Sequence, residues 1–270
     1  MPFAEITSDV GPVRLEYEWV GAPASPRPVL VFLHEGLGSV AAWKDFPDAL
    51  CRALGLRGLV YSRYGYGQST PKPPAEHWDP RFMHTQAHEA LPALLSSLGV
   101  ERPWLFGHSD GGSIALLYAA KVPQAASGLI VVAPHIRVEG LSLRSIAAAR
   151  EAYANTDLRL RLARYHADVD SAFRGWNDAW LDPAFAEWSI EDELHRITCP
   201  VLAVQGVDDE YGTLEQVHGI ARRVPQAQVL VLAQCGHSPH RDQPERLIGA
   251  TASFIQSAAS SAPKSPQRPA

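Results

Sequence analysis

Short, continuous runs of apolar residues recur along the chain at the length of β-strands. They lack the alternation of apolar and polar residues that half-exposed strands show, so they are typical of strands buried on both faces of a parallel sheet. Segments of helical length lie between most of them, which predicts right-handed βαβ units and a doubly wound sheet. The predicted strands are 29–33, 58–61, 104–106, 129–133, 201–205 and 229–232, and the predicted helices between and after them are 43–54, 82–98, 110–121, 213–224 and 245–257.

Two parts of the chain depart from this alternation. Residues 3–7 and 13–19 come first and predict an opening pair of antiparallel edge strands. Residues 137–196 carry three of the chain's seven tryptophans and only helical patterns, at 142–155, 156–167, 170–179 and 190–196. Because this segment follows a strand, it predicts a cap over the carboxyl edge of the sheet, where ligands bind in open α/β folds. A peripheral helical bundle without a substrate role is the alternative.

The predicted organisation is therefore an α/β fold with a doubly wound, mostly parallel sheet and an all-helical insertion. A length of 270 residues suits one large domain of this kind. The sheet and its helices would comprise residues 1–136 and 197–258, and the cap would comprise residues 137–196. Residues 259–270 are small, polar and proline-rich, which predicts a disordered tail.

Composition and charge exclude several classes of function. Hydrophobic residues make up 46% of the chain and charged residues 20%, which allows a sizeable core. The net charge of −5 comes without a long basic run, so neither nucleic acid nor an anionic membrane surface is an expected partner. The first residues lack the pattern of a signal peptide, so we expect none, and no apolar run reaches the length of a bilayer span. Three widely spaced cysteines do not form a disulfide framework, so we expect a cytoplasmic protein.

The strongest chemical signal is a glycine-rich turn between a predicted strand and a predicted helix. The residues Gly107-His108-Ser109-Asp110-Gly111 fit the pattern G-x-S-x-G in that setting. A serine on such a sharp turn needs neighbours without side chains that would clash. The N-terminus of the following helix favours negative charge that develops beside it. Ser109 is therefore the predicted nucleophile.

On this motif and its setting, residues 3–257 resemble the α/β-hydrolases that carry a helical cap. Members of that family use Ser, then Asp or Glu, then His in chain order. The resemblance implies that His237, in the G-H pair after the last strand, is the base that takes the serine proton. It also implies that Asp209, in a G-x-x-D pattern, is the acid that orients this base. The neighbouring Asp208 and Glu210 are the alternatives for the acid.

The tetrahedral intermediate of acyl transfer needs backbone N–H donors. The resemblance implies that one comes from Asp110, directly after the nucleophile, and the other from Gly36, in the loop after the first buried strand. Glu35 stands in that loop where glycine is usual. A carboxylate aimed at an oxyanion would oppose catalysis, so Glu35 is expected either to point into a hydrogen-bonded network or to touch substrate. Residues 62–69 resemble a structural loop of the family, and we interpret them as architecture.

A serine rather than an aspartate at this position indicates acyl transfer. We expect a serine hydrolase that cleaves a small carboxylic ester or lactone through an acyl-enzyme at Ser109, without metal or cofactor. The further candidates for contact with the small-molecule substrate are Glu35, His135, Trp176 and Trp180.

Three alternatives to this function stay open. A carbon–carbon hydrolase acting on a vinylogous diketo acid would hold the substrate carboxylate with an arginine of the cap, of which Arg137, Arg144 and Arg150 are candidates. An aminopeptidase could use Glu35 to hold the substrate amine. A ligand-binding receptor could keep the fold without the reaction. The sequence also leaves open whether the protein is a homo-oligomer.

Overall fold

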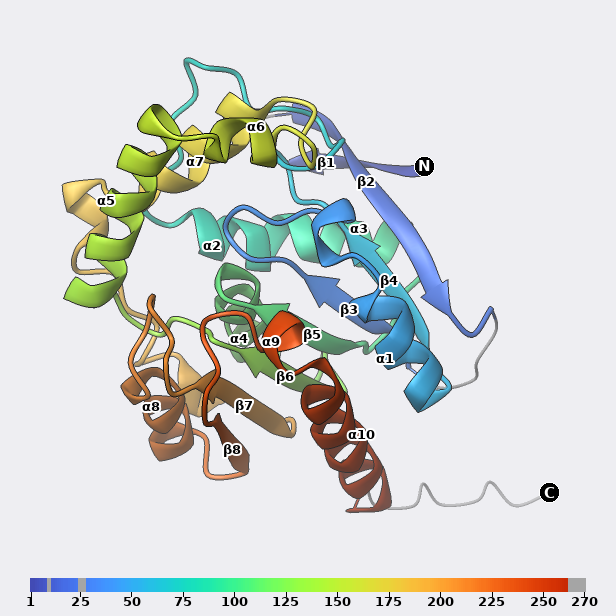
Figure 1. The fold of residues 1–270 in the computed structure, drawn as a ribbon. Helices are drawn as coiled ribbons and strands as arrows, with labels where there is room; N and C mark the ends of the chain where they lie inside the picture. Colours follow the sequence, from blue (N-terminus) through green and yellow to red (C-terminus); the bar gives the residue numbers. More distant parts are fainter. Residues whose placement is uncertain (9–10, 24–27, 262–270) are drawn as a thin grey trace.

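The computed structural model describes residues 1–8, 11–23 and 28–261, and its centre is an eight-stranded sheet in the order β1-β2-β4-β3-β5-β6-β7-β8 (Figure 1). Six of the strands are parallel: β3 (Leu30–Leu33), β4 (Arg57–Tyr61), β5 (Trp104–His108), β6 (Gly128–Val132), β7 (Val201–Gly206) and β8 (Ala227–Leu232). The antiparallel strands are β1 (Phe3–Ser8) and β2 (Gly11–Gly21). The doubly wound, mostly parallel sheet is thus confirmed.

Both faces of the sheet are covered, which explains the unbroken apolar runs. In β3, Leu30 and Phe32 belong to the core beneath α1 (Phe46–Leu54) and α10 (Pro244–Ser261). Val31 and Leu33 face the opposite core, with α3 (Leu91–Ser97), α4 (Asp110–Lys121) and α8 (Glu215–Arg223). Because every residue of such a strand meets a helix on one face or the other, no position favours a polar side chain.

Helix α4 begins and ends at the predicted residues and is buried along nearly its whole length, from Asp110 to Ala120. It packs against β3, β5 and β6 on one side and against shorter helical segments on the other. A helix that is enclosed in this way does not need a polar face. Its N-terminus is therefore fixed firmly at the carboxyl end of β5.

The segment between β6 and β7 contains α5 (Gly140–Asn155), α6 (Leu158–Leu162) and α7 (Val169–Trp180), followed by 3₁₀ turns at Pro183–Phe185 and Leu194–Arg196. Figure 1 shows α5–α7 together at one end of the molecule, away from α10. An isolated antiparallel bridge between Arg137 and Ser189 joins the two ends of the segment.

Two helices predicted in this segment do not form at the expected length. Residues 156–167 form only the short α6, since the N–H of Ala167 donates to Gly67 O at 2.8 Å. Residues 190–196 form turns and one 3₁₀ turn, in which the N–H of Glu193 donates to Ile190 O at 3.0 Å, three residues earlier rather than four.

Two other predicted helices need correction. The predicted helix 43–54 becomes a 3₁₀ turn, Ala41–Trp43, and α1, because Lys44 adopts a positive φ of 55° between them. The predicted helix 82–98 is divided into α2 (Phe82–Thr85), a π-helical turn (Gln86–Ala90) and α3, where the Pro92 ring cannot follow a regular α-helical turn.

Two boundary predictions also change. Strand β2 is not an edge strand, because it pairs with β4 as well as with β1. Helix α10 continues to Ser261, so residues 259–261 are helical rather than part of a tail, and residues 262–270 lie outside the described residues. None of the helices in the described ranges combines the length and the apolar character that crossing a bilayer requires.

Candidate active site

Ser109 occupies a strained turn between β5 and α4, with φ 52° and ψ −120°. Side chains are excluded on both sides of it. A Cβ atom at Gly107 would lie 2.3 Å from Gly111 O, and one at Gly111 would lie 2.1 Å from Leu33 O. The two glycines of the motif are therefore required by the close approach of backbone atoms, and the turn presents the serine at the carboxyl edge of the sheet.

A continuous chain of hydrogen bonds joins Ser109 to the two other predicted site residues. Ser109 Oγ lies 3.0 Å from His237 Nε2, and His237 Nδ1 lies 2.8 Å from Asp209 Oδ1. These residues come from the turn after β5, the loop after β8 and the loop after β7, so the parallel sheet brings together positions that are 128 and 28 residues apart. With Nδ1–H donating to the carboxylate, Nε2 is free to accept the serine proton.

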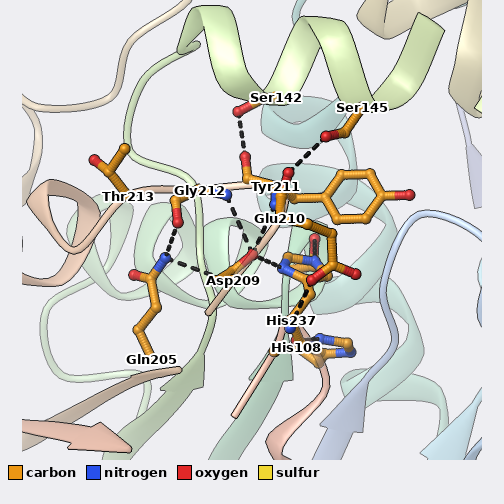
Figure 2. A network of polar contacts seen from close by, with 12 residues as sticks. His108, Ser142, Ser145, Gln205, Asp209, Glu210, Tyr211, Gly212, Thr213 and His237 are labelled. Atoms are coloured by element: carbon orange, nitrogen blue, oxygen red, sulfur yellow. Dashed lines mark hydrogen bonds and ion pairs between the residues drawn. The ribbon is translucent and has the colours of Figure 1, made fainter. Parts of the chain in front are cut away.

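Both oxygens of the Asp209 carboxylate accept hydrogen bonds. Its Oδ1 also accepts the backbone N–H groups of Tyr211 at 2.8 Å and Gly212 at 3.2 Å, and its Oδ2 accepts Gln205 Nε2 at 3.1 Å (Figure 2). Burial would raise the pKa of Asp209, but the hydrogen bonds from His237 and Tyr211 outweigh burial and lower it. Asp209 therefore carries a negative charge beside the imidazole.

The two alternatives for the acid point elsewhere. The side chain of Asp208 is exposed to solvent, and its backbone N–H donates to Cys235 O at 2.9 Å. Glu210 Oε2 accepts the backbone N–H of His237 at 3.2 Å and does not meet the ring. Of the three acidic residues in this loop, only Asp209 reaches the imidazole.

Helix α5 holds the loop that carries this acid. Figure 2 shows two serines of α5 above it: Ser142 Oγ donates to Tyr211 O at 2.5 Å and Ser145 Oγ donates to Glu210 O at 2.5 Å. The segment between β6 and β7 thus contributes to the geometry of the site as well as lying near it.

The backbone N–H groups of Gly36 and Asp110, the two predicted oxyanion donors, have no hydrogen-bond acceptor in the described ranges of the chain. The Asp110 N–H is also the first of helix α4, where the helix dipole favours a negative charge. Both groups could therefore bind an oxygen that becomes negative during a reaction at Ser109.

Glu35 faces the imidazole of His108 and the guanidinium of Arg241, and both lie beyond ordinary hydrogen-bond distance. Its Oε2 lies 3.7 Å from His108 Nδ1, and its Oε1 lies 3.7 Å from Arg241 Nη2. Burial opposes ionisation, yet His108 and Arg241 hold the pKa of the Glu35 carboxyl well below its usual range. The Glu35 carboxylate is therefore ionised on the pocket wall, with the positive charge of Arg241 beside it.

Ser109 opens into a cavity of about 280 Å³, which is a suitable size for a small molecule. The predicted contact residues Glu35, His135, Trp176 and Trp180 all line it. Sequence reasoning missed the other apolar and aromatic residues of its wall, which come from several separate segments: Leu37, Ile146, Leu162, Tyr165 and Tyr211.

His135 is buried between Trp180 and His237, with ring centroids 4.9 and 6.0 Å away. Burial, aided by the charge of His237, lowers the pKa of His135 to about 3. His135 is therefore a neutral wall of the cavity at physiological pH.

The candidate arginines Arg137, Arg144 and Arg150 of the 137–196 segment do not line the cavity. Arg137 pairs with Glu191 at 3.4 Å, and Arg150 pairs with Asp178 at 2.7 Å. Two cationic side chains that sequence reasoning did not consider, Lys44 and Arg241, line it instead.

Arg63, in the loop interpreted as architecture, lies directly beneath the site. Its guanidinium donates to His34 O at 2.9 Å and to Glu35 O at 3.0 Å, and it lies 3.8 Å from Asp110 Oδ2. A buried arginine needs such partners, but the sequence does not indicate which ones it finds.

Comparisons with known proteins agree with this fold. A family model described as "Alpha/beta hydrolase family" matches residues 30–250. The putative carbamate hydrolase RutD of Caulobacter sp. (strain K31) is 28% identical over 263 residues, covering 89% of this chain and 95% of that protein. The sn-1-specific diacylglycerol lipase ABHD11 of Mus musculus is 24% identical over 279 residues, covering 92% and 87%. A solved structure from work on carboxylesterases of Nitrososphaera gargenis superposes with a TM-score of 0.76 at 19% identity, covering 97% of this chain and 100% of that one.

Proposed function

The chain belongs to the α/β hydrolase family, and on that premise we propose that it is a serine hydrolase that cleaves a small carboxylic ester or lactone through an acyl-enzyme at Ser109. The observation that carries this proposal is the hydrogen-bonded chain from Ser109 Oγ to His237, at 3.0 Å, and from His237 to Asp209, at 2.8 Å. Its serine lies on a strained turn at the wall of a cavity.

The reaction follows from the positions of these groups. His237 Nε2 takes the proton as Ser109 Oγ attacks the substrate carbonyl, and Asp209 stabilises the imidazolium that forms. The N–H groups of Gly36 and Asp110 bind the carbonyl oxygen as it becomes negative. The intermediate collapses as His237 gives its proton to the leaving alcohol. Water then attacks the acyl-enzyme by the same route and releases the acid.

We further propose that residues 137–196 form a cap that closes this site. Helix α5 holds the Asp209 loop, and Trp176 and Trp180 of α7 line the cavity beside Ser109. A lid of this kind limits the size of the substrate and excludes water during the first step.

The positions of the cap arginines favour an ester over a diketo acid whose carboxylate such an arginine would hold. The arginines of the cap that could hold a substrate carboxylate are paired on the outside or absent from the lining. A carbamate, the substrate class in the name of one relative, undergoes the same acyl transfer and belongs in the same substrate panel.

The first test is whether Ser109 is a reactive nucleophile. A fluorophosphonate probe should label the wild-type protein, and Ser109→Ala should abolish both labelling and ester hydrolysis. In a serine protease, loss of the nucleophile lowers kcat on the order of 10⁶-fold. A folded Ser109→Ala variant with near wild-type turnover would refute the proposal, and an unlabelled wild-type protein would favour a receptor.

The second test identifies the substrate class. p-Nitrophenyl esters of increasing chain length, lactones, an aryl carbamate and a vinylogous diketo acid are assayed side by side. Turnover of the diketo acid in preference to all esters and lactones would overturn the ester assignment while keeping the nucleophile.

A further inference from the structure

Helix α7 contacts both residues whose N–H groups are the proposed oxyanion donors. The indole Nε1–H of Trp180 donates to Asp110 Oδ1 at 3.2 Å. Trp176 packs directly on Gly36, where a Cβ atom would lie 2.1 Å from the indole Nε1. A single helix outside the sheet therefore touches the two halves of the proposed oxyanion hole.

The side chain of Asp110 is a buried carboxyl group with few partners. It is 1% exposed, and in the described ranges the indole of Trp180 is its only hydrogen-bond donor. Its other oxygen lies 3.8 Å from Arg63 Nη2 without a hydrogen bond. Burial raises the pKa of the Asp110 carboxyl, while Arg63 and Trp180 oppose that rise. A buried polar group of this kind depends strongly on each partner that remains.

Arg63 connects this group to the second donor. It donates to the carbonyl oxygen of Glu35, which belongs to the same peptide unit as the Gly36 N–H. In a trans peptide the C=O and N–H groups point in opposite directions. By holding Glu35 O, Arg63 directs the Gly36 N–H away from itself, and by facing Asp110 it ties the two loops together.

We propose that Trp180 is a positioning residue of the oxyanion hole, which holds the Asp110 N–H in line with the Gly36 N–H through its hydrogen bond to the Asp110 side chain. This inference rests on the proposed function. It gives Trp180 a role different from that of a pocket wall: loss of its N–H should slow acyl transfer for every substrate, because the same N–H donor serves each of them.

The test removes the indole N–H and keeps an aromatic ring. Trp180→Phe should lower kcat for p-nitrophenyl acetate with little change in KM. Removal of one oxyanion donor lowers kcat about 10²–10³-fold, and a displaced donor should lose part of that, about ten- to a hundred-fold. Short-chain and long-chain esters should lose rate by the same factor.

Trp188→Phe is the matched control. Trp188 is another buried tryptophan of the 137–196 segment, and its indole N–H has no hydrogen-bond partner in the described ranges. The same change of side chain there removes no such bond, so kcat should stay close to that of the wild type.

A second readout separates positioning from a general loss of structure. A trifluoromethyl ketone forms a tetrahedral adduct with the nucleophilic serine, and the adduct's oxyanion occupies the same donors as the intermediate. Its inhibition constant should rise in Trp180→Phe by about the factor by which kcat/KM falls, because both depend on binding of the oxyanion. If Trp180→Phe does not fold, substituting β-(3-benzothienyl)alanine for Trp180 removes the N–H at nearly constant shape.

The outcomes are distinguishable. An inactive wild-type protein that does not react with fluorophosphonate would end the proposed function, and this inference with it. An active wild-type protein with equal kcat and inhibition constants in Trp180→Phe and Trp188→Phe would overturn the inference alone. A change confined to KM, or to the ratio between substrates, would also overturn it and would make Trp180 a pocket wall.

Discussion

Replacement of Asp209 tests the site most sharply, because the structure predicts different results for two substitutions. Three donors meet at Oδ1: the N–H groups of Tyr211 and Gly212 and His237 Nδ1. Among the described residues, only Gln205 donates to Oδ2. In Asp209→Asn the amide oxygen should therefore take the Oδ1 position, and the amide NH₂ should face Gln205, whose Oε1 has no partner in the described ranges. If the Gln205 amide rotates, its Oε1 accepts from the new NH₂ and its Nε2 gives up the hydrogen bond to Gly212 O at 2.8 Å.

This orientation determines the size of the effect. With an oxygen still at Oδ1, His237 keeps Nδ1–H as a donor and hence the correct tautomer, so Asp209→Asn loses only the negative charge. Hydrogen bonds to charged groups contribute about 1.5–3 kcal/mol, which corresponds to a fall in kcat of about 10- to 150-fold. Asp209→Ala removes every acceptor and leaves the tautomer free. Its loss should approach the roughly 10⁴-fold fall seen where the tautomer is wrong in the serine protease triad.

The assay is kcat for p-nitrophenyl acetate at constant pH, with urea unfolding to show that each variant is folded. Asp208→Asn is the control, because that side chain is exposed and does not contact the imidazole. If Asp209→Asn falls as far as Asp209→Ala, the argument from the amide orientation is wrong. If Asp208→Asn loses more activity than Asp209→Asn, the acid is Asp208.

Two further predictions concern the cap and acid stability. Trp176→Ala should change kcat/KM for a long-chain ester relative to acetate by tenfold or more, since an apolar group in a pocket contributes about 1–3 kcal/mol. An unchanged ratio of kcat/KM values in a stable variant would contradict the proposed lid. Burial lowers the pKa of His135 to about 3 and of His240 to about 2, below the value of about 6.5 in an unfolded chain. The unfolded chain therefore binds more protons, and stability should fall as the pH drops below about 6.5, by at most about 1.4 kcal/mol per pH unit for each histidine. Equal urea midpoints at pH 7.5 and pH 5 would contradict this.

The sheet and the strained serine turn could be predicted because their causes are local in the sequence. A run such as Leu30–Leu33 is apolar at every position because both faces of its strand are covered. This pattern can be recognised within a few residues of sequence. Gly107 and Gly111 are required by contacts of the turn with itself and with β3, and their spacing around Ser109 is fixed. The family membership was therefore predictable from one motif in its setting.

The helix boundaries in the segment between β6 and β7 were harder to predict, because distant parts of the chain form hydrogen bonds with this segment. The pattern of residues 156–167 is helical, yet the side chain of His166 bonds the N–H of Gly67 at 3.0 Å and faces Leu37 O at 3.0 Å. These contacts cross 99 and 129 residues of sequence. The local pattern of apolar residues does not reveal such distant partners. A prediction from that pattern therefore continues the helix past the residue where tertiary contacts end it.

The same distinction explains what the sequence predicted about Asp110. Its backbone role followed from its place after the serine, because the turn geometry alone puts that N–H beside the reacting oxygen. Its side chain depends on Arg63, 47 residues earlier, and on Trp180, 70 residues later in another helical segment. Motif spacing therefore predicts the atoms that would react, whereas the groups that hold those atoms are chosen by packing between distant segments. For this reason the sequence could name Trp180 and Asp209, but the different results expected for Trp180→Phe, Asp209→Asn and Asp209→Ala follow only from the structure, which shows which donor meets which oxygen.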